Sequence, residues 1–214
     1  MNPNVWLSDK EWVRQEAAEL VGCRDVVYLD TETTGLGTDA EVVEVAVVNQ
    51  AGEVVFESLV KPTRPIPAEA TSVHGISDAD VASAPTFAEI APKLARAILG
   101  KVLVIYNRDY DVRLLKQSAR AWGVTFDALA LASESWCAME AYAVYHGAFS
   151  DYHGSYTWQK LGNAVAQMKL TVPVGLKLHG ARADAECTRL LVRAMGSAVP
   201  AGQTREKWTT KEER

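Results

Sequence analysis

Arg24-Asp-Val-Val-Tyr-Leu-Asp-Thr-Glu-Thr-Thr-Gly35 decides the fold, because an apolar run ends there in two acids and a turn. Val26 to Leu29 has the composition of a buried strand. Successive side chains on a strand point to opposite faces, so Asp30 and Glu32 project on the same side of the sheet. A cation would offset their repulsion, and hard oxygen ligands suit Mg²⁺ or Mn²⁺. The stretch therefore predicts a divalent-metal site, although a lone Asp-x-Glu is also typical of a strand end whose acids face solvent.

Size and composition indicate one globular core. The chain has 214 residues, of which 48% are hydrophobic, as is ordinary for a soluble domain. We predict a helix packed on the core within residues 1–23, the main domain at 24–196 and a flexible tail at 197–214. No run approaches the roughly 20 apolar residues that span a bilayer, and the N-terminus lacks a signal-peptide pattern. A cytoplasmic protein without a membrane partner is therefore expected.

Cysteine count and charge narrow the function classes. Cys23, Cys137 and Cys187 are odd in number and far apart, so neither a disulfide framework nor a zinc site is indicated. The net charge of -5 and a pI near 5.4 argue against a protein that coats nucleic acid with a broad basic surface. A focused nucleic-acid site remains open, because bound cations dominate the local field of a carboxylate cluster.

The hydrophobic pattern predicts a mixed five-stranded sheet, in which three antiparallel strands are followed by helix-linked parallel strands, flanked by helices. The expected strands are 26–29, 41–48, 53–60, 102–106 and 129–132, with a hairpin at Ala51-Gly52. Expected helices are 9–21, 87–99, 110–122, 138–146, 158–168 and 181–195, with capping boxes at Ser8 and Thr86. Residues 61–67 and 73–80 read as irregular surface connections.

Two later segments add acids to the first pair. Asn107 and Asp111 follow an apolar strand and share a helical face if the next helix starts early. Asp109 points to another side of that helix and is expected to face solvent. Near the C-terminus, His179 precedes a helix that carries Asp184. A histidine exchanges a proton near neutral pH without an unusual environment, which suits a general base. Taken alone, the first segment is also typical of an ordinary helix start, and His179 alone is more typical of an ordinary loop residue.

Together these motifs resemble the DEDDh (DnaQ-like) family of 3′-5′ exonucleases, which has the ribonuclease H-like fold. The resemblance covers residues 24–196 and rests on Asp30-Thr-Glu32-Thr-Thr-Gly35, Asn107-x-x-Tyr-Asp111 and His179-x-Ala-x-x-Asp184, in that order. Val73-His-Gly-Ile76 and Ala84-Pro-Thr-Phe87 also look like the family's connecting segment. Two departures are Tyr110, where phenylalanine is commoner, and residues 135–140, which lack the usual Asp-Thr pair. The second departure obscures subgroup and substrate.

The resemblance implies two divalent cations, Mg²⁺ or Mn²⁺, held by four acids. Asp30 would contact both ions, Glu32 and Asp184 the ion that holds the nucleophilic water, and Asp111 the second ion. His179 would take the proton from the water. The substrate-binding residues that the resemblance and the local pattern suggest are Thr33, Gly35, Leu36, His74, Asn107 and Tyr110. For His74 and Tyr110, ordinary packing is the alternative.

Several further side chains are open candidates for substrate contact. Stacking on bases is one interpretation, and core or loop packing the other, for Tyr106, Tyr152, Tyr156 and Trp158. Phosphate binding is one interpretation, and a solvated helix face the other, for Arg108, Arg113, Lys116 and Arg120.

The sequence thus favours a metal-dependent 3′-5′ exonuclease that acts on single-stranded nucleic-acid ends, with DNA as the favoured substrate, and releases nucleoside 5′-monophosphates. An enzyme that trims RNA or oligoribonucleotides uses the same chemistry and stays open. A proofreading subunit of a polymerase assembly is the alternative from another class. It predicts a docking segment, which the charged 202–214 stretch does not resemble, so no obligate protein partner is expected. The role of residues 142–158 stays open.

Overall fold

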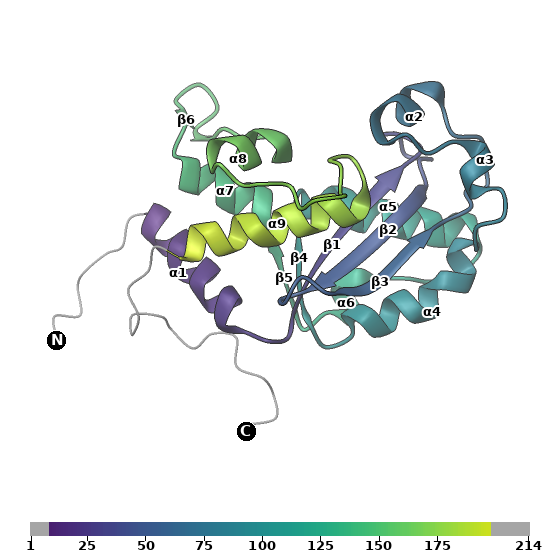
Figure 1. The fold of residues 1–214 in the computed structure, drawn as a ribbon, viewed down its shortest axis with the longest axis horizontal. Coiled ribbons are helices and arrows are strands. Elements are labelled where there is room, and N and C mark those ends of the chain that lie inside the picture. The colour runs from purple at the N-terminus through teal and green to yellow at the C-terminus, as the bar shows by residue number, and fades with distance from the viewer. Residues whose placement is uncertain (1–8, 198–214) are drawn as a thin grey trace, which may run out of the picture.

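A five-stranded sheet lies at the centre of the computed structural model, which describes residues 9–197 (Figure 1). Its strand order is β3-β2-β1-β4-β5. The strands are β1 Val26–Thr33, β2 Val42–Asn49, β3 Val54–Leu59, β4 Val102–Ile105 and β5 Glu134–Cys137. Strands β1, β2 and β3 are antiparallel, whereas β4 and β5 run parallel to β1. The predicted mixed sheet is confirmed.

Helices cover both faces of this sheet (Figure 1). They are α1 Asp9–Gly22, α2 Ala68–His74, α3 Asp78–Val81, α4 Phe87–Ile98, α5 Arg108–Ala121, α6 Ala128–Leu131, α7 Ala138–His146, α8 Leu161–Gln167 and α9 Ala181–Gly196. A small hairpin of β6 Phe149–Ser150 and β7 Ser155–Tyr156 connects α7 to α8. Among residues 9–197, no helix combines the length and apolar character required to cross a membrane.

Local signals explain several of these boundaries. The Thr86 hydroxyl accepts the Glu89 N–H, and the Glu89 carboxylate accepts the Thr86 N–H at 2.7 Å, so the predicted capping box starts α4. Gly52 has φ 85° in the turn between β2 and β3, a conformation that favours glycine. Cys23, Cys137 and Cys187 are buried free thiols.

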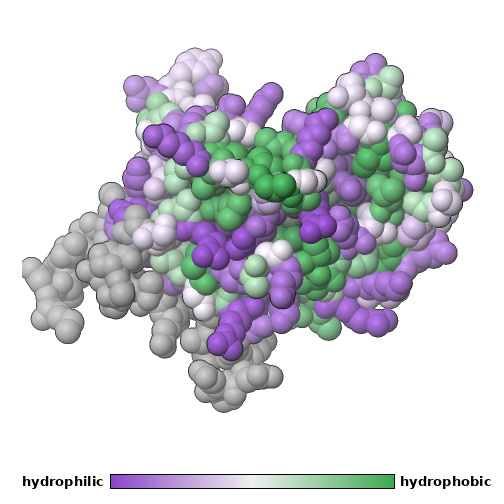
Figure 2. Space-filling model, in the orientation of Figure 1, coloured by the Kyte–Doolittle hydropathy of each residue, from purple (hydrophilic) through white to green (hydrophobic). Residues whose placement is uncertain are grey.

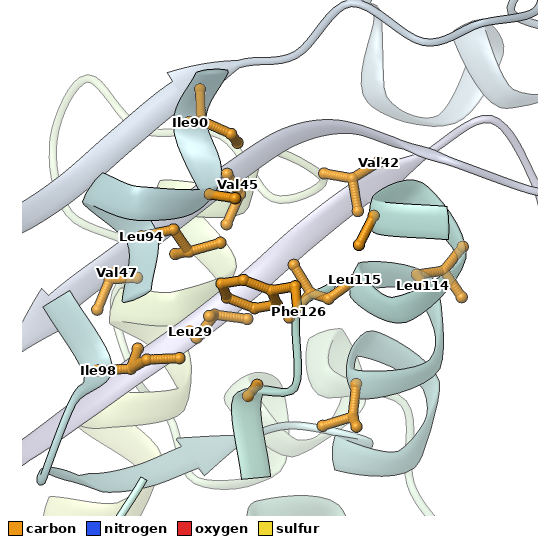
Figure 3. Packing of buried hydrophobic residues seen from close by; sticks show 14 of the residues in the cluster. Leu29, Val42, Val45, Val47, Ile90, Leu94, Ile98, Leu114, Leu115 and Phe126 are labelled. Atoms are coloured by element: carbon orange, nitrogen blue, oxygen red, sulfur yellow. The ribbon is translucent and has the colours of Figure 1, made fainter. Parts of the chain in front are cut away.

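The alternation of side chains on β1 divides the core into two layers. Val27 and Leu29 face α4, α5 and α6 and belong to the cluster drawn in Figure 3. Val26 and Tyr28 point to the other face, where α1, α7, α8 and α9 pack. The same parity continues beyond Leu29. Asp30 and Glu32 therefore lie on the α9 side of the sheet, and Thr31 lies on the α5 side.

Helix α9 crosses this second face in contact with β1, β2 and α1. Its C-terminal end approaches α1 so closely that a Cβ on Gly196 would stand 2.7 Å from the Ala18 backbone nitrogen. Only glycine permits that approach without a shift of backbone. The α1 contact thus fixes the far end of α9, the helix that carries Asp184 at its first turn.

The connection after β3 is more regular than predicted. Residues 73–80, predicted as irregular, include the end of α2 and most of α3. Gly75 ends α2 with φ 82°, and Ser77 forms a capping box with Asp80 that starts α3. Both helices follow the prolines of 61–67, so these prolines delimit the helices rather than exclude them. Residues 61–67 themselves form no helix or named strand, as predicted.

The last strand lies later than predicted. Residues 129–132 are not a strand, because the Asp127 carboxylate accepts the N–H groups of Leu129 and Ala130 and starts the short helix α6. Strand β5 begins at Glu134, which pairs with Val102. Its first residues are polar because β5 lies at the edge of the sheet, so the segment lacked an apolar signal. The helix predicted from Trp158 begins at Leu161.

Some expectations fall outside the part of the chain that the structure describes. These are the Ser8 capping box and the tail from residue 198 onward. The division into segments at residues 23 and 196 stays a prediction.

Candidate functional site

Three carboxylates meet where β1 passes beneath the start of α9. One oxygen of each of Asp30, Glu32 and Asp184 lies within 4.8 Å of the others. Asp30 and Glu32 meet because strand parity puts both on the α9 face, and Asp184 because it lies in the first turn of the helix that covers this face. Three clustered carboxylate oxygens form a hard donor set of the kind that Mg²⁺ and Mn²⁺ prefer.

Asp111 reaches the same strand from the other side. Strand β4 ends at Ile105, which is paired with Leu29, so the next β1 residues have no β4 neighbour. The buried Asp111 carboxylate occupies this position, where its Oδ1 accepts the Thr31 N–H at 3.1 Å and the Thr31 hydroxyl at 2.8 Å. These bonds fix the carboxylate beside Asp30. The structure thus places all four predicted acids around β1.

Burial and mutual repulsion keep these acids partly protonated when no cation is present. Burial and, to a lesser extent, the nearby charges of Asp184 and Glu44 raise the pKa of Glu32 to about 8. Burial also raises the pKa of Asp111 to about 7 and that of Asp184 to about 6. The pKa of Asp30 lies well above its usual range, because the side chain is surrounded by protein and because Asp111 and Asp184 repel its charge. The site is short of positive charge.

His179 stands at the edge of this cluster on the loop before α9. Its backbone N–H donates to Asp184 Oδ1 at 3.3 Å, and its φ of 65° is left-handed. The side chain is exposed, and no hydrogen bond of its imidazole occurs among residues 9–197. The ring is thus free to meet a bound molecule while the backbone stays tied to an acid of the cluster.

Side chains of α5 hold the turn after Glu32, and Leu36 is exposed on this turn. The Tyr110 hydroxyl lies 2.8 Å from the Thr33 hydroxyl and donates to the Gly35 carbonyl oxygen at 3.0 Å. The Arg113 guanidinium donates to the Gly37 carbonyl oxygen. Leu36 is 81% exposed. An apolar side chain on a braced turn next to the acids is suited to contact a ligand.

His74 braces the same turn from α2. Its Nδ1 accepts the Ile76 N–H at 3.0 Å, so Nε2 carries the proton of the neutral ring and donates to the Thr33 carbonyl oxygen at 3.2 Å. Burial lowers the pKa of His74, which favours this neutral form. Asn107 caps α5 at φ 64°, and its exposed side chain makes no hydrogen bond within the described residues. Asn107 is therefore available to a ligand, and His74 is committed to the turn.

The remaining aromatic and basic candidates divide into braced and exposed side chains. The hydroxyls of Tyr106 and Tyr156 are committed to Gln159 and Asp9, whereas Tyr152 and Trp158 are 91% and 68% exposed. Arg108 pairs with Asp109, as does Lys116 with Asp127. Arg120 is exposed. The structure therefore leaves Trp158, Tyr152 and Arg120 as accessible surface groups.

Glu44 is a fifth acid that motif reasoning missed. It pairs directly with Glu32 across β1 and β2, so both side chains lie on the α9 face. Its Oε2 accepts the Ala181 N–H at 2.7 Å, and burial raises its pKa. Counting residues along the hairpin could have placed Glu44 near Glu32, but a bulge between Glu32 and Thr33 shifts the register by one residue.

Comparison with known proteins finds nucleases. The family model RNase_T, described as exonuclease, matches residues 27–191, which include the four acids and His179. The chain is 43% identical over 173 residues to an uncharacterized exonuclease of Escherichia phage 186, covering 80% of this chain and 88% of that protein. It is 35% identical over 96 residues to the DNA polymerase III subunit epsilon of Pasteurella multocida, covering 40% of this chain and 38% of that subunit.

Solved structures of nucleases share the fold. Exonuclease X in complex with 5′ overhanging duplex DNA has a TM-score of 0.58 and 26% identity, covering 81% of this chain and 92% of that one. The nuclease domain of 3′hExo, a DEDDh family member bound to rAMP, has a TM-score of 0.62 and 17% identity, covering 82% and 94%. The second likeness concerns the fold alone.

The raised pKa values predict that the cation-free protein loses stability as the pH rises. A carboxyl whose pKa is higher in the folded chain favours folding below its unfolded value of about 4. That contribution is lost as the pH passes the folded values, from about 6 for Asp184 to about 8 for Glu32. In chelator, the melting temperature should therefore fall by roughly several degrees between pH 6 and pH 8.5. Calorimetric melting across this range measures the effect.

Asp30→Asn is the matched variant, because it removes one charge of the cluster and keeps the shape of the side chain. Its melting temperature in chelator should fall less steeply, and Mn²⁺ should raise the parent's melting temperature most at the high pH. A parent curve that is flat between pH 6 and pH 8.5, and unchanged by Asp30→Asn, would contradict the electrostatic account.

Proposed function

The chain belongs to the RNase_T exonuclease family and is a DEDDh exonuclease of the ribonuclease H-like superfamily, and from this premise we propose that it removes nucleotides from the 3′ end of single-stranded DNA. The observation that carries the proposal is the cluster of Asp30, Glu32 and Asp184, next to the braced turn that exposes Leu36.

The residues present fit the divalent cations that DEDDh exonucleases use. Three hard oxygen donors converge within 4.8 Å, and burial together with the charges of neighbouring acids raises the pKa values of Asp30 and Glu32. We assign Asp30, Glu32 and Asp184 to one ion, and Asp30 with Asp111 to a second, with Mg²⁺ or Mn²⁺ as the ions. Two such ions, when bound, stabilise charge on the attacking and leaving oxygens of a phosphodiester.

His179 is the proposed general base. Its side chain is exposed and its backbone N–H donates to Asp184, so the imidazole is available at the edge of the cluster to accept the proton of the water that attacks the terminal phosphorus. The hydrogen bond from the His179 backbone N–H to Asp184 holds His179 close to the carboxylate cluster. The bond between this phosphorus and the 3′ oxygen of the preceding nucleotide breaks, and that oxygen takes up a proton, which gives a nucleoside 5′-monophosphate and a chain one nucleotide shorter with a 3′-hydroxyl end.

The turn and its neighbours suit a terminal nucleotide. Thr33 and Gly35 belong to the turn that directly follows Glu32, and Leu36 of the same turn offers apolar contact to a base of any sequence. Asn107 has an uncommitted side chain at the start of α5. Figure 2 shows hydrophobic residues exposed among hydrophilic ones on the side of the molecule where α9 lies. Contacts of this kind favour unpaired bases over a duplex.

DNA is the favoured substrate because exonuclease X, which is 26% identical over most of this chain, was solved with DNA. The partial matches to DNA polymerase III subunits point in the same direction. This chain spans less than half of the epsilon subunit that it matches, so membership of a polymerase assembly carries less support than an enzyme that acts alone.

Labelled oligonucleotides test the polarity and the substrate. With Mg²⁺ or Mn²⁺, 5′-labelled single-stranded DNA should give a ladder of progressively shorter labelled products, and 3′-labelled DNA should release its label at once as a mononucleotide. Matched RNA should be degraded more slowly. Asp30→Asn, which lacks the acid proposed to contact both ions, is the control for a contaminating nuclease and should be inactive.

Three outcomes of this assay would count against the proposal. Cutting of circular single-stranded DNA would indicate an endonuclease, and early release of a 5′ label would reverse the polarity. Faster loss of RNA than of DNA would instead support the RNA-trimming enzyme.

Replacement of His179 should slow the chemical step. Positioned general bases commonly contribute roughly 10² to 10⁴-fold to the rate. Because His179 has left-handed backbone, His179→Asn is a cleaner variant than His179→Ala, since asparagine tolerates this conformation. Single-turnover cleavage should fall by about that factor in both variants, and Mn²⁺ binding and oligonucleotide affinity should change little.

His153→Asn is the matched control, because His153 is an exposed histidine in the hairpin between β6 and β7. It should cleave at the parental rate. If the His179→Asn variant also cleaves at that rate under single-turnover conditions, His179 is not the base.

A further inference from the structure

The start of α9 is fixed by a side chain from another element. Gly180, its N-cap residue, has no side chain to accept the first free N–H groups of the helix. Glu44 on β2 fills this role, since its Oε2 accepts the Ala181 N–H at 2.7 Å. The bond joins residues 137 positions apart in the sequence and links the sheet to the helix at the site.

In the sequence, the N–H that Glu44 accepts lies between His179, the proposed base, and Asp184, a proposed metal ligand. Ala181 is two residues after His179 and three before Asp184. Within the same turn, the Asp184 N–H donates to the Gly180 carbonyl oxygen at 3.0 Å, and the His179 N–H donates to the Asp184 carboxylate. A displacement of Ala181 therefore moves the proposed base and the proposed ligand together.

The other end of the bond is rigid. Glu44 pairs with Glu32 in the β1–β2 ladder and is flanked by the fully buried Val45. Glu44 is not part of the group of oxygens within 4.8 Å of one another, so its carboxylate is not one of the three clustered donors. Its charge meets the positive end of the α9 dipole, which offsets part of its repulsion by the cluster.

We propose that Glu44 is a positioning residue of the exonuclease site, which holds the first turn of α9 so that Asp184 and His179 stay aligned with Asp30 and Glu32. The inference rests on the proposed function for its consequence in catalysis. The reach of the Glu44 side chain matters more than its charge, because alignment depends on an acceptor atom at the Ala181 N–H.

Two conservative variants separate reach from charge. Glu44→Gln keeps the length and an oxygen acceptor but is neutral, whereas Glu44→Asp keeps the charge but withdraws the oxygen by one methylene. Outer residues that orient metal ligands are commonly worth 10- to 100-fold. We expect kcat on single-stranded DNA to fall by about this factor in Glu44→Asp with KM little changed, and Glu44→Gln to stay within a few-fold of the parent. The reverse order would show that charge is what counts and would overturn the proposal.

Glu57→Gln is the matched control. Glu57 lies on the neighbouring strand β3 and pairs at 3.8 Å with Arg182 of α9, so the variant removes a charge near the same helix start without touching the Ala181 N–H. It should behave as the parent. Parental kcat in Glu44→Asp would remove Glu44 from the site.

Hydrogen exchange of the Ala181 amide, followed by NMR in chelator, tests the bond without reference to activity. The amide should be protected in the parent and in Glu44→Gln, and should exchange at least several-fold faster in Glu44→Asp. If the parent shows this exchange pattern but has no nuclease activity, the proposed function is contradicted and the contact between Glu44 and Ala181 is supported. Equal exchange of the Ala181 amide in all three proteins would contradict the contact between Glu44 and Ala181.

Discussion

Repulsion among the carboxylates beside β1 is the constraint on which the rest of the site depends. Asp30 and Glu32 share a strand face with Asp184 above them, and Asp111 approaches from the side. Burial of these carboxylates is the larger cause and their mutual repulsion adds to it, so the pKa of each acid lies above its usual range. Such a cluster is costly for the fold without cations and gains stability when cations bind, because anything that binds only the folded state favours it.

The surrounding structure keeps these acids from moving apart. Thr31 holds Asp111 through two hydrogen bonds, and Glu44 holds the first turn of α9. At the far end of that helix, Gly196 fits against α1 with no room for a side chain. These contacts come from a buried sheet and from close-packed helices, which are the parts of a protein that deform least. The geometry of the site is thus supported by contacts within the protein itself.

Much of this arrangement could be predicted from local sequence, and the rest depends on distant contacts. Strand parity predicted that Asp30 and Glu32 share a face, and a capping box predicted where α4 starts. The sequence predicted the last strand too early in the chain, because an edge strand such as β5 tolerates polar residues and so lacks a clear hydrophobic pattern. Glu44 gave no signal because its role comes from a bulged hairpin register and from Ala181, 137 positions away. Long-range partners of this kind do not appear in the periodicity of a single segment.

Proton release on cation binding tests the central claim most directly. Mn²⁺ titrated calorimetrically into the protein, in paired buffers of equal pH but different ionisation enthalpy, counts the protons that leave the site. The account predicts measurable release near pH 6, where Glu32 and Asp111, with pKa values of about 8 and about 7, still hold protons. Near pH 9 the release should be close to zero. Tight binding with no proton release at either pH would contradict a site governed by carboxylate repulsion.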